Sequence, residues 1–148
     1  MQSDYSFLVL ADSPIRNVAD VDQPGIRIAT PRGDSSDLHV SRLLKRAEMV
    51  RTDSFAAGME LLRTRQVHPF TASRVNLMAD AARIPGSRVL EDGLDVLYFA
   101  ALTPKGQAER LAYVTEFIEE AKASGLVKQA IERAGLRGVQ VAPPGNPK

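Results

Sequence analysis

A proline, a glycine and several small oxygen-bearing side chains precede an expected helix in the stretch ATPRGDSSDLHVSRLLKRA, residues 29–47. Gly33 can adopt a positive φ angle, which would let a ligand approach the backbone closely. The N–H groups at the start of the helix carry partial positive charge and attract anions. The hydroxyls of Ser35 and Ser36 and the guanidinium of Arg32 would add to this attraction. The stretch is therefore a candidate anion-binding turn.

The same stretch also fits an ordinary helix cap. Asp34, Ser35 and Ser36 all belong to the residue types that favour the N-cap position, where a side-chain oxygen stabilises a helix by about 1 kcal/mol. The carboxylates of Asp34 and Asp37 would oppose an anion and could themselves accept the N–H groups. A P-loop is excluded because the ending Gly-Lys-Ser/Thr is absent. The local pattern leaves the cap and the anion site open.

A second candidate is the stretch VHPFTASRVN, residues 67–76, in which another expected strand runs into a helix. If this strand neighbours the first, Thr71, Ser73 and Arg74 project at the same sheet edge as Ser35, since parallel strands end together. The guanidinium of Arg74 suits bidentate pairing with a carboxylate. A solvated arginine at a helix start explains the residue equally well.

Catalysis is the third chemistry to consider. Ser35 or Ser36 lies three or four residues before His39, so a hydroxyl and an imidazole could share one helix face. However, the chain has no Gly-x-Ser-x-Gly elbow and no carboxylate at a spacing that would orient the histidine. We therefore expect no catalytic residues, and we keep a small α/β hydrolase as an alternative. With no cysteine and two histidines, we also expect neither a metal nor a cofactor.

Strand-like and helix-like patterns alternate along the chain. This alternation predicts an α/β fold, with three layers and a mainly parallel sheet. The longest apolar run, residues 94–103, suits a strand that is buried on both faces. The other expected strands lie at 5–11, 26–30, 48–52, 66–72 and 88–90, and the expected helices at about 36–47, 54–62, 73–83, 107–122 and 126–134.

Size and charge narrow the possible classes of protein. The chain has 148 residues, 44% of them hydrophobic, which suits one compact domain with a real core. Lys and Arg number 19 against 18 Asp and Glu, so no overall field favours nucleic acid, and we expect no nucleic-acid partner. The first residues, MQSDYSF, lack the basic and apolar regions of a signal peptide.

Several motifs, taken in order and spacing, resemble the type 2 periplasmic solute-binding proteins of ABC transporters. Within that class they are most similar to the extracellular solute-binding family 3 and its phosphonate-binding-like relatives. The similarity spans about residues 5–135. The motifs are Ser13-Pro14-Ile15, Ala19-Asp20-Val21, Gly25-Ile26-Arg27-Ile28, Gly33-Asp34-Ser35, the element at 57–72 and the strand and turn from Tyr98 to Gly106.

This resemblance implies a periplasmic solute-binding module that works with an ABC permease. Together with the turn chemistry, it predicts a small anionic solute. Where the family commonly reads Gly-x-Val-Asp-Ala, residues 65–69 read Arg-Gln-Val-His-Pro, which argues against an amino-acid ligand. The implied ligand-binding residues are Thr30, Arg32, Asp34, Ser35 and Ser36 in the first turn and Thr71, Ala72, Ser73 and Arg74 in the second.

The resemblance also divides the chain. Residues 1–20 would form a crossing strand and hinge, 21–94 the second lobe, 95–135 the return strand and C-terminal helices of an incomplete first lobe, and 136–148 a flexible tail. The two last helices would then expose apolar stripes, so we expect a homodimer or a domain-swapped assembly. The effector-binding domain of a LysR-type regulator, which shares the bilobal fold, is the alternative among binding proteins.

Overall fold

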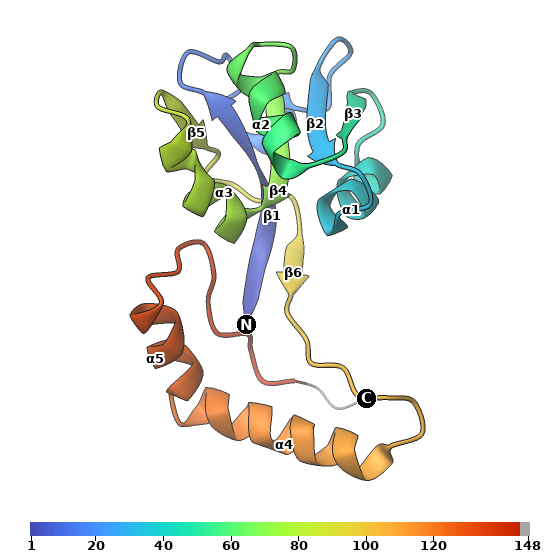
Figure 1. Ribbon diagram of the computed structural model, residues 1–148, viewed down its shortest axis with the longest axis vertical. Coiled ribbons are helices and arrows are strands. Elements are labelled where there is room, and N and C mark those ends of the chain that lie inside the picture. The colour runs from blue at the N-terminus through green and yellow to red at the C-terminus, as the bar shows by residue number, and fades with distance from the viewer. Residues whose placement is uncertain (146–148) are drawn as a thin grey trace.

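The computed structural model describes residues 1–145 and shows a sheet with its helices above a separate pair of helices, α4 and α5 (Figure 1). The elements are, in order, β1 (Gln2–Leu10), the short helix η1 (Val18–Asp20), β2 (Arg27–Pro31), α1 (Ser35–Leu43), β3 (Glu48–Thr52), α2 (Phe55–Arg63), β4 (Pro69–Ser73), α3 (Arg74–Asp80), the short helix η2 (Ala81–Arg83), β5 (Ser87–Val89), β6 (Val96–Tyr98), α4 (Ala108–Ala123) and α5 (Leu126–Arg133). None of the described helices combines the length and the apolar character that crossing a membrane requires.

The sheet has the strand order β3-β2-β4-β1-β5, and β6 pairs with the first residues of β1. The expected α/β class is confirmed, but the sheet is mixed rather than mainly parallel. Strand β2 is parallel to β3 and β4, whereas β1 is antiparallel to β4, β5 and β6. The difference arises because β1 enters the sheet from the side of α4 and α5, opposite to the direction of β4.

Two hydrophobic cores lie on opposite faces of the sheet, which makes the fold three-layered. Successive side chains of a strand point to opposite faces, and β1 follows this rule. Leu8 packs with Leu62 of α2 and Leu77 of α3, whereas Phe7 packs with Val40 of α1 on the other face. All five side chains are fully buried, and burial of a side chain of this size contributes about 1.5–3 kcal/mol.

Helix α2 is capped by Ser54 and packs closely against β4. The Ser54 hydroxyl accepts the N–H of Ala57 at 3.1 Å and so caps the helix. Gly58 lies against the ring of Phe70 in β4, and a Cβ atom at Gly58 would lie only 2.4 Å from that ring. Helix and strand therefore approach at a distance that only glycine permits.

Helix α1 ends at Leu43, four residues before its expected end. The carboxylate of Asp22 accepts the N–H groups of Lys45, Arg46 and Ala47 at 2.7–3.1 Å. These amides would otherwise continue the helical hydrogen bonds. The loop before β2 therefore ends the helix through Asp22. The helical periodicity of the sequence gives no sign of this contact.

Strand β4 lies in the middle of the sheet although it contains Pro69. The proline occupies the first residue of the strand. Proline is tolerated there because its missing N–H leaves no ladder hydrogen bond unmade.

The expected buried strand at 94–103 is wrong in both length and burial. Only Val96–Tyr98 forms a strand, β6, which pairs on one side with β1. The side chain of Tyr98 is 59% exposed and that of Leu102 is 93% exposed. Leu94 and Leu97 pack against the core on one face of the sheet, whereas most of the run from Tyr98 onward is exposed.

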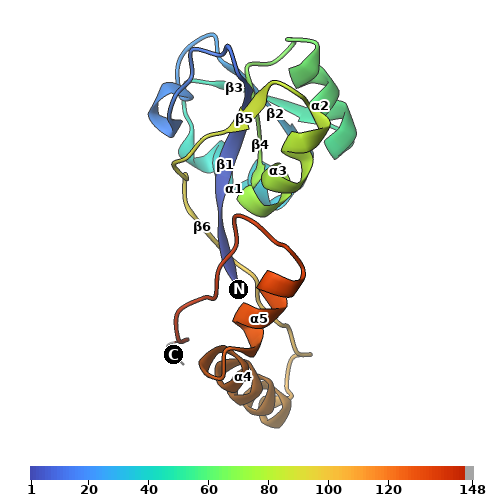
Figure 2. The ribbon, with the colours of Figure 1, turned by 90° about the vertical axis from the view of Figure 1, so that its left-hand side faces the viewer.

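The chain after α5 returns to the start of β1, as Figure 2 shows from the side. Gln140 and Gln2 form an antiparallel bridge with two N–H···O bonds of 2.9 Å, and the Ser3 hydroxyl donates to the carbonyl oxygen of Gly138. Part of the expected tail is therefore fastened to β1. Residues 146–148 of that tail lie outside the described residues.

Candidate functional site

The two candidate turns lie side by side, as the sequence predicts for neighbouring strands. Strand β2 runs into α1 and strand β4 runs into α3, and the two strands are parallel with Ala29 opposite Phe70. The Ser36 hydroxyl reaches the carbonyl oxygen of Thr71 at 3.4 Å. Both strand-to-helix turns therefore open at the same edge of the sheet.

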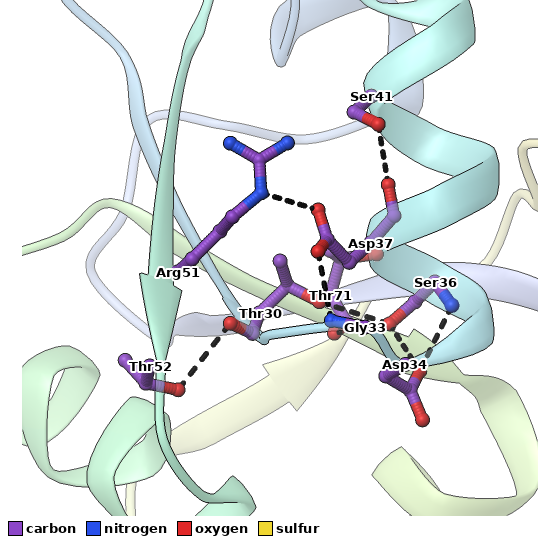
Figure 3. A network of polar contacts seen from close by, with 9 residues as sticks. All are labelled: Thr30, Gly33, Asp34, Ser36, Asp37, Ser41, Arg51, Thr52 and Thr71. Carbon is purple, nitrogen blue, oxygen red and sulfur yellow. Dashed lines mark hydrogen bonds and ion pairs between the residues drawn. The ribbon is translucent and has the colours of Figure 1, made fainter.

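A chain of hydroxyl groups fastens the first turn (Figure 3). The Ser36 hydroxyl donates to Asp34 Oδ1 at 2.6 Å, and it lies 2.9 Å from Thr30 Oγ1. Asp34 Oδ1 also accepts the N–H of Ser36 at 2.8 Å, so Asp34 is the N-cap of α1. The Thr71 hydroxyl donates to the carbonyl oxygen of Ser6 at 3.0 Å. Thr30, Ser36 and Thr71 are fully buried; the hydroxyls of Thr30 and Ser36 hold the turn, and the hydroxyl of Thr71 joins β4 to β1.

A second carboxylate, that of Asp37, serves the same turn. Gly33 has the expected positive φ of 73°, and its N–H donates to Asp37 Oδ2 at 2.9 Å. The other oxygen of Asp37 accepts Nε of Arg51 at 2.8 Å, and the Asp37 side chain is only 6% exposed. The cap interpretation is therefore confirmed at Asp34. Two carboxylates of the chain already occupy amides that an anion would need.

Arg51 is a residue that sequence reasoning missed. It lies on β3, opposite Thr30 of β2, and the register of these two strands brings its guanidinium to Asp37. The only sequence signal is a basic residue near the end of the strand that precedes α2. Such a signal does not identify its partner.

Arg74 does not face the first turn. Its Nε and one terminal nitrogen donate to the two carboxylate oxygens of Asp4 at 2.6 and 2.7 Å. Its terminal nitrogens also donate to the carbonyl oxygens of Leu90 and Asp92. The side chain is 12% exposed. Arg74 was expected to pair with the carboxylate of a solute through two hydrogen bonds. It forms this bidentate pair with Asp4 of β1 instead.

The other residues predicted to bind a ligand differ in their exposure to solvent. Arg32 and Ser35 are exposed, and Asp34 is half-buried. Ser73 is 6% exposed and stands at the N-cap position of α3 without making a side-chain cap bond. Ala72, implied by the resemblance alone, is buried in β4. A solute at this edge would therefore meet Arg32 and Ser35 first.

His39 points away from both serines. Its Nε2 lies 2.8 Å from Asp95 Oδ2, and its ring stacks on Tyr5 with the centroids 4.9 Å apart. The N–H of Val96 and then His39 hold the pKa of Asp95 below its usual value. Within residues 1–145 no hydrogen bond joins His39 to Ser35 or Ser36. The constellation that a hydrolase would need is not assembled.

The described part of the chain also offers no metal centre. Within residues 1–145, no group of three or more His, Asp or Glu side chains is arranged to hold a metal ion.

Comparison with known proteins gives matches in structure and none in sequence. No protein-family model matches the chain, and no curated protein is similar to it in sequence. A binding component of an ABC transporter from Wolinella succinogenes, complexed with lysine, has a TM-score of 0.78 at 20% identity. An ancestral amino acid-binding protein, a precursor of cyclohexadienyl dehydratase, has a TM-score of 0.74 at 17% identity. A cysteine-binding protein from Campylobacter jejuni has a TM-score of 0.73 at 15% identity.

These structures are longer than this chain. Each match covers 90% of this chain but only 59%, 58% and 53% of the three proteins in the order given. At such low identity the likeness establishes the fold. The chain therefore has the fold of the type 2 binding proteins of ABC transporters and spans little more than half of their length.

Proposed function

We propose that the chain is a solute-binding module of an ABC uptake system, acting in the periplasm with an ABC permease. The observation that carries this proposal is the pair of strand-to-helix turns at one sheet edge, within a fold shared with an ABC transporter binding component at a TM-score of 0.78. In open α/β sheets, ligands bind outside the carboxyl ends of the strands, which is where these turns lie.

The solute we propose is a small molecule that carries both a carboxylate and a positive group. The sequence favoured an anion, but Asp34 and Asp37 reduce the attraction of the α1 N-terminus for a purely anionic ligand. Arg32 and Ser35 supply exposed donors for a carboxylate. The Asp34 oxygen that does not accept from Ser36 points away from the hydroxyl network (Figure 3), where it can accept from an ammonium group. This revision brings amino acids back among the candidate solutes.

A binding role, rather than catalysis, is also part of the proposal. It is supported by the separation of His39 from the serines, because His39 is paired with Asp95. It is supported as well by the fold, which the chain shares with proteins described as binding components.

We further propose that the chain forms a homodimer through α4 and the segment after β6. Leu102 is 93% exposed and Tyr113 is 71% exposed, and they line one groove of about 570 Å³ together with Pro104 and Val114. Soluble monomers rarely expose a continuous apolar surface of this kind. A two-fold dimer is the commonest way in which a chain covers such a surface with a second copy.

The binding proposal is tested by mutating the exposed donors. Arg32→Ala and Ser35→Ala should each weaken binding of an amino acid found to stabilise the wild-type chain, by roughly tenfold per lost charge-assisted hydrogen bond. Arg133→Ala, at an exposed arginine of α5, is the matched control. Equal affinity in all three variants would place the solute elsewhere. Ester hydrolysis that is lost in Ser36→Ala would instead favour the hydrolase.

A further inference from the structure

One side of β6 has no neighbouring strand. Strand β6 pairs with β1, and among the described residues no strand lies on its other side. The main-chain groups of Asp95 and Phe99 point to β1 and the residue before it, because they form hydrogen bonds there. Since main-chain groups alternate in direction along an antiparallel strand, those of Val96 and Tyr98 point to the open side. We call this side, together with the segment up to Leu102 that runs on toward α4 (Figure 1), the open edge.

Three residues of the open edge lack main-chain partners. Within residues 1–145, neither the N–H nor the carbonyl oxygen of Tyr98, Ala100 or Leu102 forms a hydrogen bond. An extended chain turns the main-chain groups of alternate residues to the same side, so these three form one row of donors and acceptors. Such a row at the edge of a sheet is a template for another strand.

The row has a defined length. At one end, the N–H of Val96 is already held by Asp95 Oδ1 at 2.7 Å. At the other end, Pro104 has no N–H to donate. No charged side chain lies between Val96 and Pro104, although charges are a common means of keeping a sheet edge from pairing. The strand that fits this edge therefore needs three matching residues.

A second copy of the chain supplies these three residues. In antiparallel pairing around a two-fold axis at Ala100, Tyr98 of each copy lies opposite Leu102 of the other. Each such pair exchanges two N–H···O bonds, so every free main-chain group of the row finds a partner. The contact is isologous, because both copies use the same residues.

Shifted registers leave some of these groups unpaired. With the axis one residue earlier, Leu102 would lie opposite Val96, whose N–H is already held. With the axis one residue later, Tyr98 would lie opposite Pro104, which cannot donate. The main chain therefore selects the register centred on Ala100.

The side chains favour the same register. Tyr98 is 59% exposed and Leu102 is 93% exposed, and in this register they become neighbours across the two strands, a contact that stabilises sheets. Beyond the paired residues, the exposed Lys105 of one copy lies on the side of Asp95 of the other, whose side chain is 50% exposed. Opposite charges thus approach each other at both ends of the pairing.

We propose that two copies of the chain pair edge to edge through residues 98–102, antiparallel about a two-fold axis at Ala100. The pairing joins the two β6 strands, and with them the first residues of both β1 strands, into one continuous sheet. This inference rests on the homodimer proposed above and specifies which strands pair and in which register.

Single cysteines test the register, because the chain has no cysteine of its own. Ala100→Cys places the two thiols opposite each other, with the Cα atoms about 5.5 Å apart, a distance that a disulfide spans. Ala101→Cys is the matched control, since the two alanines are neighbours and both are exposed. Its Cα atoms would lie roughly 8 Å apart in the same register, from the rise per residue and the strand spacing. Under mild oxidation we expect Ala100→Cys to become almost entirely a covalent dimer and Ala101→Cys to stay largely uncrosslinked.

Proline variants test the main-chain hydrogen bonds. Ala100→Pro removes the N–H at the axis in both copies and should raise the Kd of the dimer at least roughly tenfold, measured by analytical ultracentrifugation. Ala101→Pro removes an N–H that points away from the open edge and should keep the Kd of the wild type.

The outcomes separate this inference from the homodimer itself. A wild-type chain that stays monomeric would overturn both. A wild-type dimer would leave the homodimer standing but overturn the strand pairing if the two cysteine variants crosslink equally, or if Ala100→Pro dimerises as well as Ala101→Pro.

Discussion

At the scale of residues, Asp34 and Asp37 decide what the turn before α1 can bind. Asp34 caps the helix and orders Ser36, and Asp37 joins the amide of Gly33 to the guanidinium of Arg51. These contacts give the turn a fixed shape without any ligand. They also leave Arg32 and Ser35 as the groups that a solute can reach. The turn is therefore held in shape by the chain itself, and it carries both a cationic side chain, Arg32, and two anionic ones, Asp34 and Asp37.

The first prediction concerns Asp37. Replacing it by alanine removes the acceptor of the Gly33 amide and leaves Arg51 without its partner. Arg51 is 39% exposed and stays solvated, so we expect a loss of about 1–3 kcal/mol in the free energy of unfolding, measured by urea denaturation. Asp53→Ala, at an exposed aspartate nearby, is the control. Equal loss in both variants would show that Asp37 has no special role.

The second prediction concerns Asp95 and pH. The N–H of Val96 and then His39 hold the pKa of Asp95 below its usual 3.8 in the folded chain. Because the pKa of Asp95 is lower in the folded chain than in the unfolded chain, its ionised carboxylate stabilises the fold at any pH above the unfolded-state pKa. This stabilisation is lost as the pH falls through the pKa of Asp95 in the folded chain. The melting temperature of the wild type should therefore exceed that of Asp95→Asn at neutral pH, and the difference should shrink as the pH falls below 3.8. A difference that stays constant with pH would contradict this account.

At the scale of elements, helix starts and strand positions follow from sequence, and contacts distant in sequence do not. Helix α2 starts at residue 55, one residue from its expected start, and Gly33 has the positive φ that the sequence predicts. The pairing of Arg74 with Asp4, by contrast, joins residues 70 positions apart, and local patterns carry no signal for it. The apolar run at 94–103 predicted a buried strand because hydrophobicity alone does not tell whether another element lies above it.

A third prediction tests how α2 packs on β4. If helix propensity decided the outcome, Gly58→Ala would stabilise the chain by up to about 1 kcal/mol. The added Cβ atom, however, would lie 2.4 Å from the Phe70 ring, and forcing extra atoms into a packed core costs about 1–3 kcal/mol. We expect a lower free energy of unfolding in chemical denaturation. A more stable variant would mean that helix and strand can separate at little cost.

At the scale of the whole molecule, the sheet lobe and the pair α4 and α5 are joined by β1, β6 and the returning segment at 138–140 (Figure 1). The sheet lobe has two complete cores, whereas the α4 surface remains exposed over Leu111, Tyr113 and Phe117. Exposed apolar side chains on this helix were expected, but the helical spacing pointed to Leu111, Val114, Ile118 and Ala121, of which only Leu111 is exposed and Ala121 is buried. The sequence also implied a first lobe of which this chain supplies one part.

The fourth prediction is the oligomeric state. A homodimer through α4 should sediment at about twice the chain mass of 16.1 kDa. Tyr113→Glu with Phe117→Glu places two charges in the contact and should give monomers, because an unpaired charge is costly in an apolar interface. Arg133→Glu on α5 is the control and should remain dimeric. A wild-type chain that stays monomeric at high concentration would contradict the dimer.

In the proposed function, the two turns at the carboxyl edge of β2 and β4 bind a small solute. Isothermal titration calorimetry of the full chain with lysine, arginine, cysteine and glutamine, and with succinate and methylphosphonate as anionic comparisons, tests it most directly. We expect saturable binding of at least one amino acid, with weaker binding in Arg32→Ala and Ser35→Ala and no change in Arg133→Ala. No binding of any of the six compounds, or binding that these variants leave unchanged, would contradict the claim.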